Sequence, residues 1–147
     1  MKHESVSRSS ASTHVVTPLL LFGVAVLHST GILFGWYWSF SFFSGLLHFL
    51  GGMAAAAVAL WIFERYAHLD LHAVHPAVFF VMILSAVALI GVCWEFFEFA
   101  LDAGFFGAPT FRSQLGVGDT MGDLALDLLG GTILFGLSRL QSKTRVG

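Results

Sequence analysis

Charged residues are scarce in this sequence of 147 residues, at 11% of the chain, whereas hydrophobic residues make up 56% of it. An ordinary soluble domain carries about 25% charged residues, which it needs to cover its surface in water. The mean hydropathy is +0.82. This composition excludes an ordinary water-soluble globule and favours a chain that crosses a lipid bilayer several times.

The lack of other residue types and motifs excludes further structural features and classes of function. The single cysteine, Cys93, excludes an internal disulfide, and the lack of any asparagine excludes an N-glycosylation sequon. The formal net charge is −2 and no basic stripe appears, so we expect no nucleic-acid partner. The sequence also lacks the short motifs of nucleotide-binding loops, zinc metalloproteases and serine hydrolases.

The hydrophobic residues gather in four long runs, near residues 16–37, 43–63, 77–99 and 119–138. A run of about 20 apolar residues can cross a bilayer as a helix, and a helix satisfies its own backbone hydrogen bonds there. We therefore predict an all-α fold, an integral membrane bundle of four transmembrane helices over residues 15–140. The polar, Ser-rich residues 1–14 are predicted to be a disordered cytoplasmic tail, and residues 141–147 a cytoplasmic tail.

The basic residues predict the orientation of the bundle. With four spans, both ends of the domain lie on one side, and that side receives six of the seven basic residues: Lys2, Arg8, Arg65, Arg139, Lys143 and Arg145. Only Arg112 falls on the other side. Because cytoplasmic loops are enriched in Lys and Arg, both termini are predicted to be cytoplasmic.

Ionisable residues concentrate in the outer half of the predicted bundle. Six of the nine acidic residues lie at the outer end of the third run or in the first turns of the fourth: Glu95, Glu98, Asp102, Asp119, Asp123 and Asp127. Spacings of three and four place each group of three along one helix side. His28 and His48 are expected at a similar depth in the first two runs.

These buried charges need partners, because a charge facing lipid near the bilayer centre costs about 2.5–3.5 kcal/mol. No Lys or Arg lies within the four runs, which leaves protonated carboxyls, water or a bound cation. Oxygen ligands with one or two histidines suit Mg²⁺, Mn²⁺ or Zn²⁺. The candidate ligands of a divalent metal ion are Glu95, Glu98, Asp123, Asp127 and His48, with Asp102, Asp119 and His28 as further candidates.

Two alternative interpretations stay open. In the first, the acidic residues are polar contacts that hold membrane helices together, and Asp119 is the N-cap of the last helix. Separately, His68, His72 and His75 are spaced by four and three in a cytoplasmic loop. That spacing fits either a weak zinc site or a solvated turn.

The stretches "WEFFEFALD" (94–102) and "GDTMGDLALDLLGG" (118–131) resemble the YjdF-like family of bacterial inner-membrane proteins. The resemblance marks Glu95, Glu98, Asp119, Asp123 and Asp127, and relates His48 in "LLHFLGG" to a histidine of the family's earlier span. The opening at Asp119 departs from the Q-G-D of some members. The resemblance implies a multi-pass protein of the bacterial inner membrane and carries no assigned activity.

Three functions remain open at this stage. The first is a metal or cation site, with hydrolysis of a membrane-level substrate by metal-bound water as an extension. The second is a proton or cation transport component. The third is a small structural or accessory membrane protein. The lipid bilayer is the expected partner, a homo-oligomer is left open, and the ligand is unknown.

Overall fold

The computed structural model describes residues 3–66, 74–104 and 116–144, and every regular element in these ranges is a helix. The elements are α1 (His3–Leu33), α2 (Trp36–Ser39), α3 (Phe43–Tyr66), α4 (Pro76–Asp102) and α5 (Val117–Thr144). Four segments are long and apolar enough to cross a membrane: Val15–Leu33, Phe43–Tyr66, Pro76–Asp102 and Val117–Gln141. The prediction of an all-α bundle with four membrane-crossing helices is confirmed.

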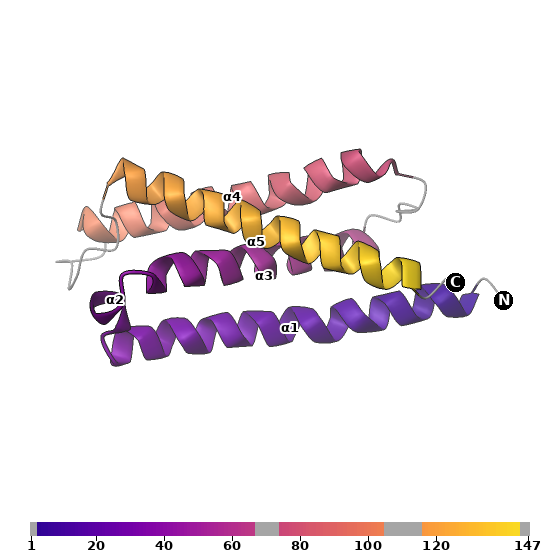
Figure 1. Cartoon of the computed structure of the whole chain (residues 1–147), viewed down its shortest axis with the longest axis horizontal. Coiled ribbons are helices and arrows are strands. Elements are labelled where there is room, and N and C mark those ends of the chain that lie inside the picture. The colour runs from indigo at the N-terminus through magenta and orange to yellow at the C-terminus, as the bar shows by residue number, and fades with distance from the viewer. Residues whose placement is uncertain (1–2, 67–73, 105–115, 145–147) are drawn as a thin grey trace.

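The four long helices run along one common axis, and α3 is the central one (Figure 1). Helix α3 packs against α1, α4 and α5. Half of the residues in its most apolar stretch are buried inside the bundle, whereas only 11% are buried in the corresponding stretch of α1. Helix α1 begins and α5 ends at the same end of the bundle, while α2 lies at the opposite end. We call these the terminal end and the α2 end.

The first helix differs from its predicted bounds at both ends. Helix α1 continues back to His3, into the segment that was predicted to be a disordered tail. At the other end it stops at Leu33 instead of near residue 37, and Gly35 follows with a φ of 69°. This left-handed conformation suits glycine and ends a helix. The chain then reverses, and Trp36–Ser39 form the separate helix α2.

The core at the terminal end of the bundle is apolar. Its buried residues come from α3, α4 and α5, and we call them the apolar layer: Ala55, Ala56, Ala59, Leu60, Phe79, Ile83, Val87 and Phe135. Alanines on α3 allow the neighbouring helices to approach closely, as small residues do in membrane bundles. The rings of Phe79 and Phe135 meet edge to face, with centroids 5.8 Å apart.

Glycines set the distance between helices nearer the α2 end. A Cβ built on Gly52 of α3 would collide with the backbone carbonyl of Asp127 on α5, and one on Gly130 of α5 would collide with the carbonyl of Phe49. Helices α3 and α5 are therefore in backbone contact at this crossing. The contact brings the α3 side chain His48 beside the α5 side chain Asp127.

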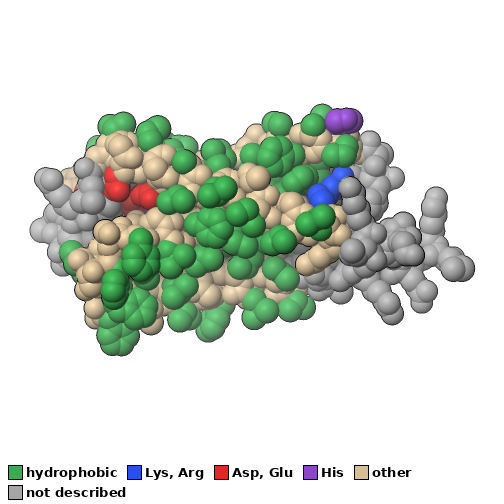
Figure 2. All heavy atoms as spheres, in the orientation of Figure 1, with side chains coloured by type: hydrophobic (Ala, Val, Ile, Leu, Met, Phe, Trp, Pro, Cys, Tyr) green, Lys and Arg blue, Asp and Glu red, His purple; other side chains and the backbone are tan. Residues whose placement is uncertain are grey.

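The surface has the polarity expected of a membrane-spanning bundle. Figure 2 shows a broad band of hydrophobic side chains, with acidic side chains at one end of this face and basic and histidine side chains at the other. Large apolar residues such as Phe22, Leu89 and Phe96 are about two-thirds exposed, at 70%, 66% and 69%. Contact of these side chains with lipid is favourable, whereas their exposure to water would be unfavourable.

Candidate functional site

A buried group of ionisable side chains surrounds His48 on α3. His48 is 6% exposed, Glu95 on α4 is 4% exposed, and Asp123 and Asp127 on α5 are 7% and 5% exposed. Glu98, one helical turn beyond Glu95, is partly buried. We call these five residues the polar layer. Four of the five are more than 90% buried. At such burial an ionised side chain is strongly disfavoured unless it has partners.

The two nitrogens of the His48 ring face different carboxylates. Its Nδ1 lies 3.4 Å from Oδ2 of Asp127, within hydrogen-bonding distance. Its Nε2 lies 3.6 Å from Oδ2 of Asp123 and 3.8 Å from Oε1 of Glu95. In the tautomer in which Nδ1–H donates a hydrogen bond to the Asp127 carboxylate, Nε2 presents its lone pair to the space between Glu95 and Asp123.

Three of these residues have the spacing of a metal-binding group. His48, Glu95 and Glu98 each offer one ligand atom, and these atoms all lie within 4.8 Å of one another. One imidazole nitrogen with carboxylate oxygens is a donor set for Mn²⁺, Zn²⁺ or Mg²⁺. The same convergence of carboxylates would also suit shared protons or water.

Room for this layer comes from a missing side chain on α4. A Cβ on Gly91 would lie 2.6 Å from Oδ2 of Asp127, one turn before Glu95. Asp127 therefore occupies space between α3 and α4 that only glycine at position 91 leaves open. In "IGVCWEFFE" the glycine, Glu95 and Glu98 follow the spacing of four and three that keeps residues on one helix side.

A second polar chain links α1 to the same layer. His28 Nδ1 lies 2.7 Å from the Tyr37 hydroxyl, and the His28 ring meets the Trp94 ring edge to face. Trp94 Nε1 donates to Oε1 of Glu98 at 2.9 Å. Burial, and secondarily the Glu98 carboxylate, raise the pKa of the Tyr37 hydroxyl above its ordinary value. The hydroxyl therefore stays protonated and available as a donor.

His28, Asp102 and Asp119, the three further candidates, lie outside the group around His48. His28 contacts Tyr37 and Trp94, as described above. Asp102 is the last residue of α4 and is partly exposed. Helix α5 begins at Val117, so Asp119 lies in its first turn, two residues after the helix start, and not at the N-cap position that one of the alternative interpretations gave it. A carboxylate there is still stabilised by the positive end of the helix dipole.

Only part of the separate histidine motif can be located. His75 precedes α4, and its Nδ1 accepts a hydrogen bond from the Ala77 backbone N–H at 3.3 Å. It therefore caps the helix. His68 and His72 lie outside the described residues, so the weak zinc site predicted for these three histidines stays a prediction.

Sequence reasoning missed several residues that shape the site. Trp94 is one of them, and it lies four residues before the predicted candidate Glu98 on the same helix, a spacing that could have indicated their hydrogen bond. Gly91 follows the same repeat, so its role was also within reach. Nothing in the sequence indicated that Tyr37 folds back onto His28, because run 16–37 gave no sign of the reversal at Gly35.

The sequence matches the family described as "Predicted membrane protein (DUF2238)" over residues 7–144. The match spans nearly all of the chain, including every residue of the polar layer. The chain therefore belongs to this family of predicted membrane proteins, and it sits in a lipid bilayer as a multi-pass protein. No curated protein and no solved structure matches it.

Proposed function

We propose that the polar layer binds one divalent metal ion. The observation that carries the proposal is the convergence of ligand atoms from His48, Glu95 and Glu98, all within 4.8 Å of one another. Asp123 adds a fourth donor on the same side of the imidazole, 3.6 Å from Nε2. One nitrogen and three or more oxygens from two carboxylate-bearing helices form a set that Mn²⁺ or Zn²⁺ accepts readily.

The charge of the layer supports a cation rather than a neutral packing contact. Four carboxyl groups surround one histidine, and α3 has no Lys or Arg before Arg65, α4 has none, and α5 has none before Arg139. A divalent ion would offset two negative charges without requiring a basic side chain. It would also replace the repulsion among the carboxylates with attraction.

The hydrogen bond on Nδ1 gives Asp127 a positioning role. Its carboxylate accepts from His48 and fixes the ring so that Nε2 faces Glu95 and Asp123. Such carboxylate–histidine pairs orient a metal ligand and raise its basicity. We therefore assign His48, Glu95, Glu98 and Asp123 as ligands, and Asp127 as the residue that holds His48 in position.

Transport through the bundle is less well supported. A path across the membrane would have to continue from the polar layer through the apolar layer, where Ile83 and Ala56 are fully buried and packed with phenylalanines. That layer offers an ion no ligand. A purely structural polar layer remains the competing explanation, and metal analysis separates it from the proposal.

We also propose that the membrane is the bacterial inner membrane and that both termini are cytoplasmic. The likeness of the two acidic motifs to the YjdF-like family supports the compartment, and the distribution of Lys and Arg supports the orientation. With α1 starting and α5 ending at one end of the bundle, a single reporter fused after Gly147 tests the orientation. Periplasmic phosphatase activity of that fusion would contradict it.

The test of the metal site is elemental analysis of detergent-purified protein, compared with the Glu95→Gln variant. We expect about one divalent ion per wild-type chain and a large loss in Glu95→Gln. Glu64→Gln, at the exposed far end of α3, is the matched control and should keep the metal. Trace metal in the wild type, or equal metal in Glu95→Gln, would remove the proposal in favour of a structural layer.

A further inference from the structure

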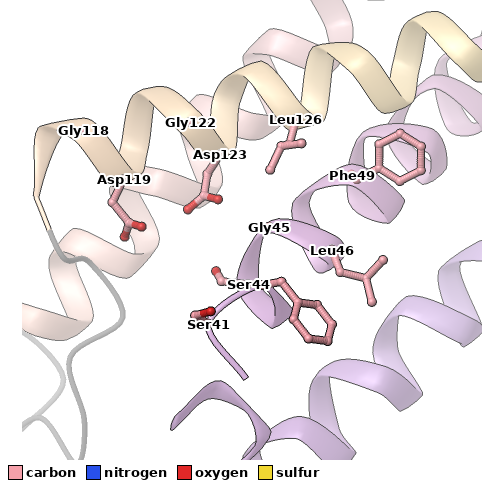
Figure 3. A pocket seen from close by; sticks show the side chains of 11 residues that line it. Ser41, Ser44, Gly45, Leu46, Phe49, Gly118, Asp119, Gly122, Asp123 and Leu126 are labelled. Carbon is pink, nitrogen blue, oxygen red and sulfur yellow. The ribbon is translucent and has the colours of Figure 1, made fainter. Parts of the chain in front are cut away.

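A groove of about 580 Å³ opens between the start of α3 and the start of α5, at the α2 end of the bundle. Figure 3 shows Asp119, Asp123 and Leu126 pointing from α5 toward the chain that carries Ser41, Ser44 and Gly45. Its volume is within the range of about 300–1,000 Å³ that is usual for ligand pockets. None of the sequence motifs indicated this groove.

The groove is divided into a polar and an apolar part. Ser41, Ser44, Asp119 and Asp123 supply hydroxyl and carboxylate groups, and the other side-chain-bearing residues are Phe42, Leu46, Phe49 and Leu126. Phe42 and Leu46 are 65% and 39% exposed, so the apolar part opens outward toward the lipid-facing surface. A ligand that fills both parts must be amphiphilic.

Glycines keep the groove open. Gly118 and Gly122 line it, and a Cβ added at either position would meet no atom of the described residues within 4 Å. At the closed end the packing is tight, because a Cβ on Gly45 would lie 2.8 Å from a methyl group of Leu126. Within the part of the chain that the structure describes, the hollow is thus bounded by packed atoms beside Gly45 and has no atoms against the two α5 glycines.

From this division we propose that the groove binds a phospholipid with a primary ammonium headgroup. The ammonium would lie beside Asp119, whose negative charge repels anionic headgroups and attracts cationic ones. The Ser41 and Ser44 hydroxyls can donate to the phosphate, and an acyl chain would cover Phe42 and Leu46. The site does not require a metal, although Asp123 would bring the headgroup next to the polar layer.

Native mass spectrometry of protein taken from a one-to-one mixture of phosphatidylethanolamine and phosphatidylglycerol tests the proposal. We expect wild-type chains to retain one phosphatidylethanolamine, with a preference of about tenfold over phosphatidylglycerol. The Gly122→Leu variant adds a side chain to the groove wall at a position where a Cβ meets no atom of the described residues, so it should fold and lose about tenfold in retention. Gly136→Leu, also in open space on α5, is the matched control and should retain the lipid.

A second variant keeps the groove open and changes only its charge. Asp119→Asn should reduce the preference for phosphatidylethanolamine while lipid of either kind still binds. Equal retention by Gly122→Leu and Gly136→Leu, or no preference in the wild type, would overturn the proposal. So would a lipid-free dimer, in which a second copy occupies the groove. Chelator-treated protein should give the same lipid result, so failure of the metal site and failure of the lipid site are distinguishable.

Discussion

The polar layer and the apolar layer are built from the same three helices and are similarly well buried, but they are held together by different forces. In the apolar layer, Ile83 and Val87 fit among alanines and phenylalanines and need nothing further. In the polar layer, burial by itself is unfavourable, because each ionised group loses its water. Along the same three helices, burial therefore stabilises the fold in the apolar layer and opposes it in the polar layer.

The comparison teaches that packing and chemistry are separated along the bundle. The terminal end supplies shape-complementary contacts, and the α2 end places charged groups at a glycine-lined crossing. Mutations at the terminal end should change stability without changing ligand content. Mutations in the polar layer should change ligand content, with an effect on stability that depends on whether the ligand is bound.

Truncation in the apolar layer should have the largest effect on stability. Ile83 is fully buried, so Ile83→Ala leaves a cavity and should lower the free energy of unfolding by about 2–5 kcal/mol. Thermal unfolding in detergent, followed by circular dichroism, measures this loss. Val81 on the same helix is 60% exposed, so Val81→Ala should lower the free energy of unfolding far less. Equal losses would mean that the apolar layer is not the packed core.

Adding a side chain where α3 and α5 cross should lower both the stability of the fold and its metal content. A Cβ on Gly52 collides with the Asp127 backbone, so Gly52→Ala should separate α3 from α5 and cost about 1–3 kcal/mol. It should also reduce metal content, because His48 and Asp127 move apart. Gly51→Ala is the control, since its Cβ would make an ordinary contact of 3.9 Å with Asp127 Oδ1. Similar behaviour of the two variants would contradict the crossing described above.

Neutralising the positioning carboxylate should act on the ligand more than on the fold. Asp127→Asn keeps the shape of the side chain but weakens its hold on His48 Nδ1, so metal affinity should fall by about 10–100-fold. Competition with a metal chelator measures the affinity. In metal-free protein the same variant should unfold at nearly the wild-type temperature. An unchanged affinity would assign Asp127 to packing alone.

The smallest effect is expected at the link to α1. Tyr37→Phe removes the 2.7 Å hydrogen bond to His28 and should cost about 0.5–1.5 kcal/mol. Because burial raises the pKa of Tyr37, the unfolded chain loses that proton first as the pH rises, and stability should fall above pH ~10. When unfolding is measured as a function of pH, the stability of Tyr37→Phe should fall less steeply above pH ~10 than that of the wild type. Identical profiles would mean that Tyr37 is not responsible.

Much of this architecture could be predicted from the sequence, because hydrophobic length and helical spacing are local properties. The four runs predicted the four membrane-crossing helices, and the spacing of Glu95 and Glu98 placed them on one side of α4. The sequence also placed His48 at a depth similar to that of the acidic residues, as one of the candidate ligands. Depth along each helix can be counted from the sequence, since a helix rises by a constant 1.5 Å per residue.

The remaining features depend on contacts that no single segment encodes. Which side of α3 faces α5 follows from the backbone contact at Gly52, and a glycine in a sequence does not name its neighbour. The fold-back of Tyr37 depends on the left-handed turn at Gly35. The groove required two helix starts, on α3 and α5, to be placed side by side in space.

The most direct test of a metal-dependent polar layer is the unfolding temperature of wild type and Glu95→Gln, each measured with chelator and with saturating Mn²⁺ or Zn²⁺. Without metal, Glu95→Gln should be at least as stable as the wild type, because it removes one buried charge. With metal, the order should reverse, because the ion stabilises only the protein that binds it. If Glu95→Gln is less stable by the same amount in both conditions, the polar layer is a structural contact and binds no ion.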